Sequence, residues 1–285
     1  KNIEKTDYTK EIFISKSKLD IKPKVFIPVF PGTNCEYDSM RAFVKAGAYV
    51  ETMVFRNRTH SDIVESIEEM KNQIETSQII MFAGGFSAGD EPDGSGKFIA
   101  NILLNNEIKD SIHKFLEKNN LILGICNGFQ ALVKSGLLPY GEIGKVDSNS
   151  PTLTTNNINR HISQMVYTRI SSTKSPWLNS FNVGDVHRIA VSHGEGKFVA
   201  SKEVLDKLIK NGQIATQYVD LEGNPTMNGI YNPNGSYIAI EGITSKDGKI
   251  FGKMGHSERM GENLYKNIDG NKVQNIFENG VKYFK

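Results

Sequence analysis

The chain has 285 residues, and its 34 Lys and Arg side chains against 32 Asp and Glu leave a formal net charge of +2. A near-neutral protein of this length suits one large α/β domain, and its charge gives no general reason to bind nucleic acid or an anionic membrane. No apolar run is long enough to cross a bilayer, the polar opening lacks the apolar core of a signal peptide, and the two cysteines are too few for a disulfide framework. We therefore expect a cytoplasmic protein.

Residues 1–22 form a Lys-rich polar segment with one short β-like run, EIFIS, at residues 11–15. Pro23, between two lysines, marks a boundary before the first strong strand pattern. The chain begins with Lys instead of Met, which is typical of a fragment or a processed product. We expect residues 1–22 to be a linker or the edge of a missing upstream region, and residues 23–285 to form one domain.

Strand and helix patterns alternate from residue 25 to residue 138. Short apolar runs predict strands over residues 25–30, 49–55, 77–83 and 121–125, and amphipathic runs predict helices over residues 35–47, 60–73, 96–119 and 127–138. Gly47 closes the first helix, and a serine, Ser61, is the expected N-cap of the second. This alternation predicts an open parallel sheet with helices on both faces, in which ligands bind at the carboxyl ends of the strands.

The second half of the chain is less regular. Strand patterns occur over residues 164–170, 186–193, 214–219, 237–245 and 249–256, with the turn-rich stretches DLEGNPTMNG and NPNGS between them. We expect these strands to form β-hairpins appended to the sheet.

Cys126 lies between the predicted strand over residues 121–125 and the predicted helix that follows. Gly124 and Gly128 flank it in a GxCxG pattern, the thiol counterpart of the GxSxG turn that presents a nucleophile beyond a sheet edge. A helix N-terminus also favours thiolate over thiol. A buried structural cysteine is the ordinary alternative, but two glycines at a strand-to-helix switch favour a nucleophile.

Two HxE pairs each follow a predicted strand and supply candidates for a general base and the group that orients it. These are His193 with Glu195, in VSHGEG, and His256 with Glu258, in MGHSER. A carboxylate close to an imidazole fixes its tautomer and stabilises the imidazolium, as in a catalytic triad. The spacing does not choose between the two pairs. A metal site is the weaker interpretation, because no third cluster completes a zinc shell.

Gly84 and Gly85 begin a glycine-rich stretch after the predicted strand over residues 77–83. The stretch MFAGGFSAGDEPDGSGK does not have the Walker spacing, so we expect no nucleoside triphosphate site. At the end of a strand beside the Cys126 strand, these glycines expose backbone N–H groups to an oxyanion, with the amide after Cys126 as the other donor. A mobile loop without a chemical role is the alternative.

The motifs AGGFSAGD, GICNGFQ, VSHGEG, NPNGS and MGHSER occur in this order between residues 24 and 259. With FPGTNCEYDSMRAF after the first strand, they resemble the glutaminase domain of phosphoribosylformylglycinamidine synthase, a class I (triad) glutamine amidotransferase of purine biosynthesis. GxCxG with a late HxE is shared by the whole class, whereas GGFSxGD, VSHGEG and NPNGS are typical of this member. We therefore expect a flavodoxin-like α/β fold, with an open, mostly parallel sheet flanked by helices and β-hairpins appended in the second half.

The resemblance implies a role for each candidate residue. Cys126 would attack the side-chain amide of glutamine, His256 would act as its base and then protonate ammonia, and Glu258 would orient His256. Gly85 and Asn127 would donate N–H groups to the oxyanion. The residues expected to line the substrate pocket are Gly84, Gln130, His193, Gly194 and Glu195.

The resemblance also implies a partner and its ligands. Ammonia would pass to a synthetase region, expected on the same full-length chain, that binds ATP, magnesium and formylglycinamide ribonucleotide. In this chain itself we expect glutamine as the ligand, and no cofactor, metal, nucleic acid or membrane.

Two departures and three alternatives accompany this interpretation. Ser257 stands where the family usually has Pro between the catalytic His and Glu, which could loosen the turn that fixes their angle. Cys35, at the start of the first predicted helix, is a second candidate thiol, but it lacks the glycine-flanked turn.

The alternative functions are the glutaminase domain of another amidotransferase, a non-catalytic docking module of the same fold, and a thiol hydrolase or redox protein.

Overall fold

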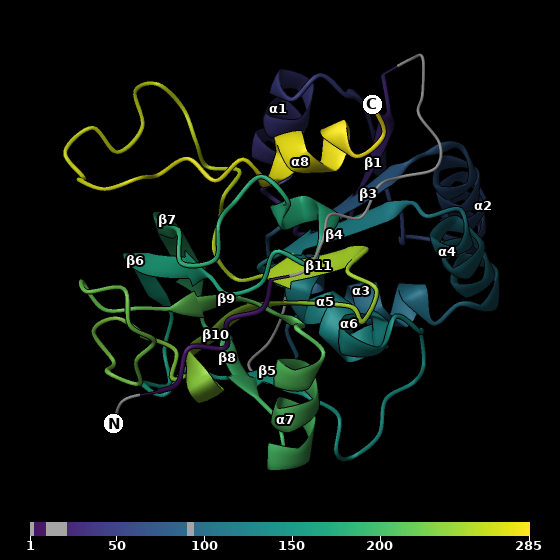
Figure 1. Ribbon diagram of the computed structural model, residues 1–285. Coiled ribbons are helices and arrows are strands. Elements are labelled where there is room, and N and C mark those ends of the chain that lie inside the picture. Colours follow the sequence, from purple (N-terminus) through teal and green to yellow (C-terminus); the bar gives the residue numbers. More distant parts are fainter. Residues whose placement is uncertain (1–2, 10–21, 90–93) are drawn as a thin grey trace.

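A computed structural model describes residues 3–9, 22–89 and 94–285 (Figure 1). The predicted strand-like run at residues 11–15 lies outside these ranges. Within them, no helix combines the length and the apolar character that crossing a membrane requires. Residues 3–9 lie against the domain: Thr6 donates two hydrogen bonds to the Gln217 side chain, and Tyr8 forms a parallel bridge with Ser172. The proposed division at residues 22 and 23 stays a prediction.

The first half of the described chain builds the parallel part of a nine-stranded sheet (Figure 1). Its strands are β1 (Lys24–Val29), β2 (Tyr49–Val54), β3 (Ile79–Phe82) and β4 (Leu121–Ile125). They lie in the order β2-β1-β3-β4, and each neighbouring pair is parallel. The predicted α/β class and strand positions are confirmed.

The strands of the second half extend the same sheet beyond β4. They are β6 (Ile162–Ile170), β7 (Val186–His193), β9 (Ile214–Tyr218), β10 (Ile240–Thr244) and β11 (Ile250–Lys253), and the sheet continues as β4-β11-β10-β9-β6-β7. All these strands pair antiparallel except β11 on β4, which is parallel. The last strand in the chain is therefore central in the sheet. A separate antiparallel pair joins β5 (Thr152–Thr154) to β8 (Lys197–Val199).

Helices cover both faces of the parallel part of the sheet. They are α1 (Glu36–Lys45), α2 (His60–Thr76), α3 (Lys97–Leu103), α4 (Asn106–Glu117), α5 (Asn127–Ser135), α6 (Leu137–Tyr140) and α8 (Ile276–Lys282), whereas α7 (Lys202–Lys210) lies beside β5, away from the parallel strands (Figure 1). Helices α1 and α8 lie together on one side of the sheet, and α3, α5 and α6 lie across the other (Figure 1). This layering is the one predicted for βα alternation.

Three helix predictions were wrong about the residue at which a helix begins or ends. Helix α2 begins after Thr59 and not at Ser61, because the Thr59 side chain accepts from Asp62 N while the Asp62 carboxylate accepts from Thr59 N, a reciprocal capping box. The single helix expected over residues 96–119 is two helices, because Asn105 caps a new helix with bonds from Glu107 N and Ile108 N. The helix expected to reach residue 138 ends at Ser135, since the next residue, Gly136, is left-handed.

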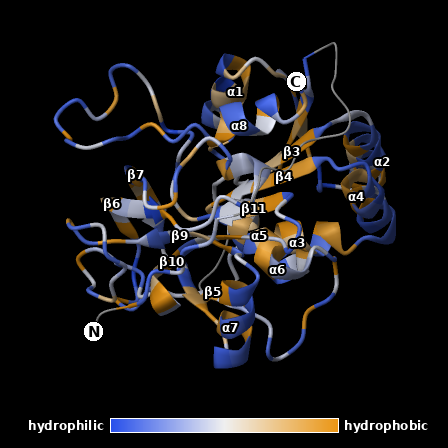
Figure 2. Ribbon diagram, viewed as in Figure 1, coloured by the Kyte–Doolittle hydropathy of each residue, from blue (hydrophilic) through white to orange (hydrophobic). Residues whose placement is uncertain are grey.

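The apolar core lies on both faces of the central strands. Every residue of β3 and β4 is buried, and Figure 2 shows these strands as mainly hydrophobic. Strands covered by helices on both faces have continuous apolar runs instead of alternation, because neither face meets water. Helix α5 packs closely on this layer at Gly128, where a Cβ atom would lie 2.0 Å from Phe82 O. That close approach places the start of α5 at the sheet edge.

Candidate active site

The ends of β4 and β11 bring together two segments that are about half the chain apart in sequence. The two strands are parallel neighbours, with Lys253 opposite Ile125. Cys126 follows β4, and its N–H donates to Lys253 O over 2.9 Å. His256 follows β11 at the same edge, and a ligand site is expected at this edge of an open α/β sheet.

Cys126 has a strained backbone in the turn between β4 and α5. Its φ is +53° and its ψ is −108°, a left-handed conformation that costs a non-glycine residue about 1–3 kcal/mol. Cys126 is 5% exposed, and its Sγ lies 3.6 Å from Ser192 O. Cys126 is the N-cap of α5 and therefore lies at the positive end of that helix dipole. The turn has the form that the GxCxG pattern predicts for a nucleophile.

His256 and Glu258 form a buried pair beside Cys126. Nδ1 of His256 lies 2.6 Å from Oε1 of Glu258, and both side chains are almost fully buried. Burial alone lowers the pKa of His256, but the Glu258 carboxylate and the Cys126 and Cys35 thiols raise it well above its usual value. Nε2 is buried and has no hydrogen-bond partner among the described residues. The ring is thus held at one nitrogen and has its other nitrogen available for proton transfer.

Gly84 lies between the groups of the site. A Cβ atom there would lie 3.0 Å from Cε1 of His256, 3.2 Å from Sγ of Cys35 and 3.4 Å from Cβ of Cys126. The three side chains therefore surround one glycine at the end of β3. Gly84 leaves room for them, and any larger residue would displace the imidazole or a thiol.

The two predicted oxyanion donors directly follow Gly84 and Cys126 in the chain. Gly85 has a φ of +147° and pairs with Thr33 in an isolated bridge, so the loop after β3 is fixed in an extended, glycine-specific form. Asn127 is the first residue of α5, and its side chain accepts from Ser87 N and donates to Gln130. Asn127 thus joins the Gly85 loop to the Cys126 turn. Their role as oxyanion donors stays a prediction.

The second HxE motif does not form an imidazole–carboxylate pair in the described structure. His193 Nδ1 lies 3.2 Å from Oδ1 of Asn156, whereas the Glu195 carboxylate accepts from Gly94 N and Ser95 N, both at 3.2 Å. Burial, with smaller effects from the charges of His256 and His161, lowers the pKa of His193 to about 3. A histidine that stays neutral in this way is poorly suited to hold the imidazolium of a triad.

The other expected pocket residues lie near the strand-to-helix turn. Gln130 donates through Nε2 to Glu195 O over 2.5 Å, which joins α5 to the VSHGEG segment. Gly194 has open space where a Cβ would lie, whereas at Gly196 a Cβ would lie 2.2 Å from the His193 ring. The structure therefore brings the predicted pocket residues to one edge of the sheet. Their contacts with a substrate stay a prediction.

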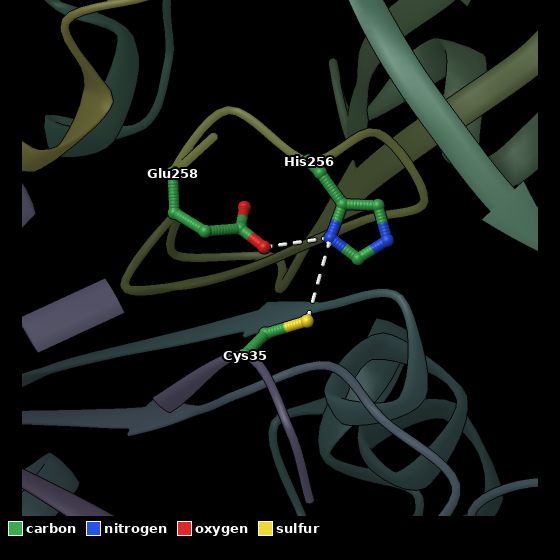
Figure 3. A group of neighbouring side chains, drawn as sticks. All are labelled: Cys35, His256 and Glu258. Atoms are coloured by element: carbon green, nitrogen blue, oxygen red, sulfur yellow. Dashed lines mark hydrogen bonds and ion pairs between the residues drawn. The ribbon is translucent and has the colours of Figure 1, made fainter. Parts of the chain in front are cut away.

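Cys35 also lies in the site, as Figure 3 shows. Its Sγ is 4.0 Å from Nδ1 of His256, the nitrogen that Glu258 already holds, and 3.4 Å from Nη2 of Arg259. Ligand-type atoms of Cys35, His256 and Glu258 lie within 4.8 Å of one another, close enough for one thiophilic cation. The Arg259 guanidinium opposes a second positive charge beside this sulfur, so we assign no metal to the group.

Sequence reasoning missed four residues that shape the site. Arg259 contacts Cys35, Asn156 holds both the ring and the carbonyl of His193, and Lys253 and Glu241 form a fully buried ion pair below the His256 turn. A charged residue in each of two otherwise apolar stretches, IAIEGI and IFGKM, was the available signal for the ion pair. Asn156 lies in a segment without a recognisable pattern.

Comparisons with known proteins agree on one family. Residues 22–284 match the CobB/CobQ-like glutamine amidotransferase domain. A protein of Methanococcus maripaludis named phosphoribosylformylglycinamidine synthase subunit PurQ is 36% identical over 281 residues, which cover 94% of this chain and 97% of that protein. The subunit of the same name from Aquifex aeolicus is 31% identical, with 87% of this chain and 95% of the relative covered.

A solved structure agrees with the sequence comparisons. The structure of PurLQS from Thermotoga maritima matches at a TM-score of 0.66 and 26% sequence identity, and the match covers 93% of this chain and 100% of that chain. The likeness extends through both the parallel and the antiparallel part of the sheet.

Proposed function

The chain belongs to the CobB/CobQ-like glutamine amidotransferase family, and from that premise we propose that it hydrolyses glutamine to glutamate and ammonia for phosphoribosylformylglycinamidine synthase. The names of its relatives support this member of the family. The observation that carries the chemistry is the meeting of the strained Cys126 turn with the buried His256–Glu258 pair at one sheet edge.

The proposed reaction begins with the Cys126 thiolate. Its sulfur forms a bond to the amide carbon of glutamine, and the carbonyl electron pair moves to oxygen, where N–H groups of Gly85 and Asn127 stabilise the charge. The oxyanion collapses and expels ammonia, which takes its proton from the His256 imidazolium. Glu258 stabilises that imidazolium during the first half of the reaction.

The second half of the reaction releases glutamate. His256, now neutral, takes a proton from water, and the resulting hydroxide adds to the thioester carbon. Collapse of the second oxyanion breaks the carbon–sulfur bond, so that glutamate leaves and the Cys126 thiolate with the His256 imidazolium is restored. No group outside this chain is consumed except glutamine and water.

The ammonia has a proposed acceptor on the synthetase. There ATP, magnesium and formylglycinamide ribonucleotide would give formylglycinamidine ribonucleotide, as part of purine biosynthesis in the cytoplasm. The relatives are named as subunits, which favours a synthetase on a separate chain, whereas the sequence interpretation expects one full-length chain. The mass of the purified natural protein distinguishes these two arrangements.

Reaction with 6-diazo-5-oxonorleucine, a glutamine-like electrophile that traps an activated thiol, tests whether Cys126 or Cys35 is the nucleophile. We expect one adduct on Cys126 in the wild-type chain and in Cys35→Ala, and none in Cys126→Ala, as measured by intact mass and peptide mapping. An adduct on Cys35 would move the nucleophile to that residue. Absence of any adduct, with the synthetase also present, would favour a non-catalytic docking module.

A further inference from the structure

Lys253 is the last residue of β11, and its side chain is fully buried against the turn that carries His256. The Glu241 side chain on β10 is also fully buried, and Lys253 Nζ lies 3.3 Å from Oε1 of Glu241. A buried ion pair often contributes little to stability, because removing two charges from water offsets their attraction. A gain in stability therefore does not explain why this ion pair is buried here.

The Lys253 ammonium donates two hydrogen bonds to the turn that carries His256. Nζ donates to Gly255 O over 3.1 Å and to Ser257 Oγ over 2.9 Å, and it forms an ion pair with Glu241. The Glu241 carboxylate accepts from Gly255 N at 2.6 Å and from the Thr216 hydroxyl. Each member of the pair is thus held by two hydrogen bonds to its surroundings, and such bonds fix the geometry of buried charges.

The contacts of the pair fall on both residues that flank His256. Gly255 is held through its N–H by Glu241 and through its carbonyl by Lys253, and Ser257 is held by Lys253 on one side and by Gln274 at 2.6 Å on the other. The backbone carbonyl of Lys253 also accepts from the N–H of Cys126. One residue therefore contacts both the nucleophile turn and the histidine turn.

We propose that Lys253, with Glu241, is a positioning residue that fixes the His256–Glu258 turn relative to Cys126. This inference rests on the proposed glutaminase reaction. Gly255 and Ser257 flank His256, and the two hydrogen bonds of the ammonium to that turn restrain it. Small displacements at a reacting centre can cost about a hundredfold in rate, so the restraint acts on catalysis.

The test removes both charges together. Lys253→Met with Glu241→Gln leaves no unpaired buried charge, which a single substitution would create, and keeps an amide oxygen for Gly255 N. Inactivation of the full chain by 6-diazo-5-oxonorleucine gives a maximal rate and a half-saturating concentration, and its pH dependence is measured as well. Circular dichroism and a cooperative urea transition establish that the variant is folded.

We expect the maximal inactivation rate to fall about tenfold or more while the half-saturating concentration changes less than about twofold, because reactivity and not binding is affected. The pH midpoint of inactivation is expected to rise, since a displaced Glu258 no longer supports the imidazolium that stabilises the thiolate. A purely structural role would lower the fraction of folded protein and leave this midpoint unchanged.

A matched control and a milder variant complete the experiment. Lys249→Met removes a lysine just before the opposite end of β11, where it binds Leu116 O and Asn119, and is expected to keep the wild-type rate and midpoint. Ser257→Ala keeps the ion pair and the bond to Gly255 O but removes the second bond of the ammonium to the turn, and is expected to shift rate and midpoint in the direction of the double variant. If the double variant does not fold, the rate and pH midpoint of Ser257→Ala test the inference in its place.

The outcomes separate this inference from the proposed function. A wild-type chain that never reacts overturns the proposed function, and the inference with it. A reactive wild type with an unchanged rate and midpoint in the folded double variant overturns the inference alone. An equal loss of rate in Lys249→Met also overturns it, because the effect would then be a general weakening of β11.

Discussion

At the scale of the residue, the two thiols of the site differ in their surroundings. Cys35 lies near Nδ1 of His256, which Glu258 already holds at 2.6 Å, and Arg259 donates to the Cys35 sulfur. Cys126 lies on the strained turn at the start of α5. A triad needs its carboxylate on one ring nitrogen and its nucleophile on the other, which favours Cys126 over Cys35.

The two HxE histidines differ in what surrounds them, and their substitution should separate them. We expect His256→Asn to lower the maximal rate of inactivation by 6-diazo-5-oxonorleucine at least about a hundredfold, the usual range for loss of a general base. His193→Asn is expected to lower it less than about tenfold, because His193 is buried, neutral and bonded to Asn156. The same measurement on both variants ranks them, and the reverse ranking would show that the wrong pair was chosen.

At the scale of the element, glycine spacing decides how closely α5 approaches the sheet. Gly128 meets the backbone of Phe82, and a Cβ at Gly124 would lie 2.9 Å from Gly128 O. The two glycines of the GxCxG pattern thus allow strand and helix to pack with almost no side chain between them. This close packing forces a sharp turn and leaves Cys126 at its tip.

Helix α2 shows how a cap decides where an element begins, and it offers a direct test. Thr59→Ala removes the hydroxyl that accepts from Asp62 N, and should lower the free energy of unfolding by about 1 kcal/mol. Ser61→Ala is the matched control. Because Ser61 lies inside the helix and bonds only to exposed Glu65, its loss should change stability by less than about 0.5 kcal/mol. Urea unfolding measures both, and equal losses would contradict the assigned cap.

At the scale of the whole molecule, buried neutral histidines make folding dependent on pH. Burial, with a smaller effect from the Lys253 charge, lowers the pKa of His187 to about 4, and burial lowers that of His193 to about 3. As pH falls below 6.5, the unfolded chain protonates both rings and the native protein does not. Their contribution to stability is therefore present above pH 6.5 and is lost as pH falls toward these folded values. The raised pKa of His256 has the opposite sign, with stability lost only as pH rises above 6.5.

The slope of stability between pH 6.5 and 5 tests this account. Each buried neutral histidine should lower the free energy of unfolding by up to about 1.4 kcal/mol per unit of falling pH. His187→Gln should remove one histidine's share of the slope, whereas His60→Gln, at the exposed start of α2, should leave the slope unchanged. Urea unfolding at several pH values measures all three proteins. A slope that is unaffected by His187→Gln would contradict the assignment.

The sequence by itself determined the local features of this protein. Apolar runs and helical periodicity predicted strands β1 to β4 and the helices between them, because burial on two faces requires such runs. The GxCxG pattern located the Cys126 turn, because only small residues permit it. Motif order identified the class of enzyme. Helix ends were less certain, since Thr59 and Ser61 are both good caps and only their hydrogen bonds distinguish them.

Only the tertiary structure decided which distant segments meet. Nothing local in the sequence shows that β11 inserts beside β4, yet this pairing places His256 at the edge that carries Cys126. The same pairing brings His256 beside Cys35, and Lys253 is buried with Glu241 against the histidine turn. It also separates two HxE motifs that are alike in spacing, because the environment of each carboxylate comes from other strands. Sequence periodicity indicates which residues of a segment are buried, whereas the order of the strands depends on the packing free energy of the whole sheet.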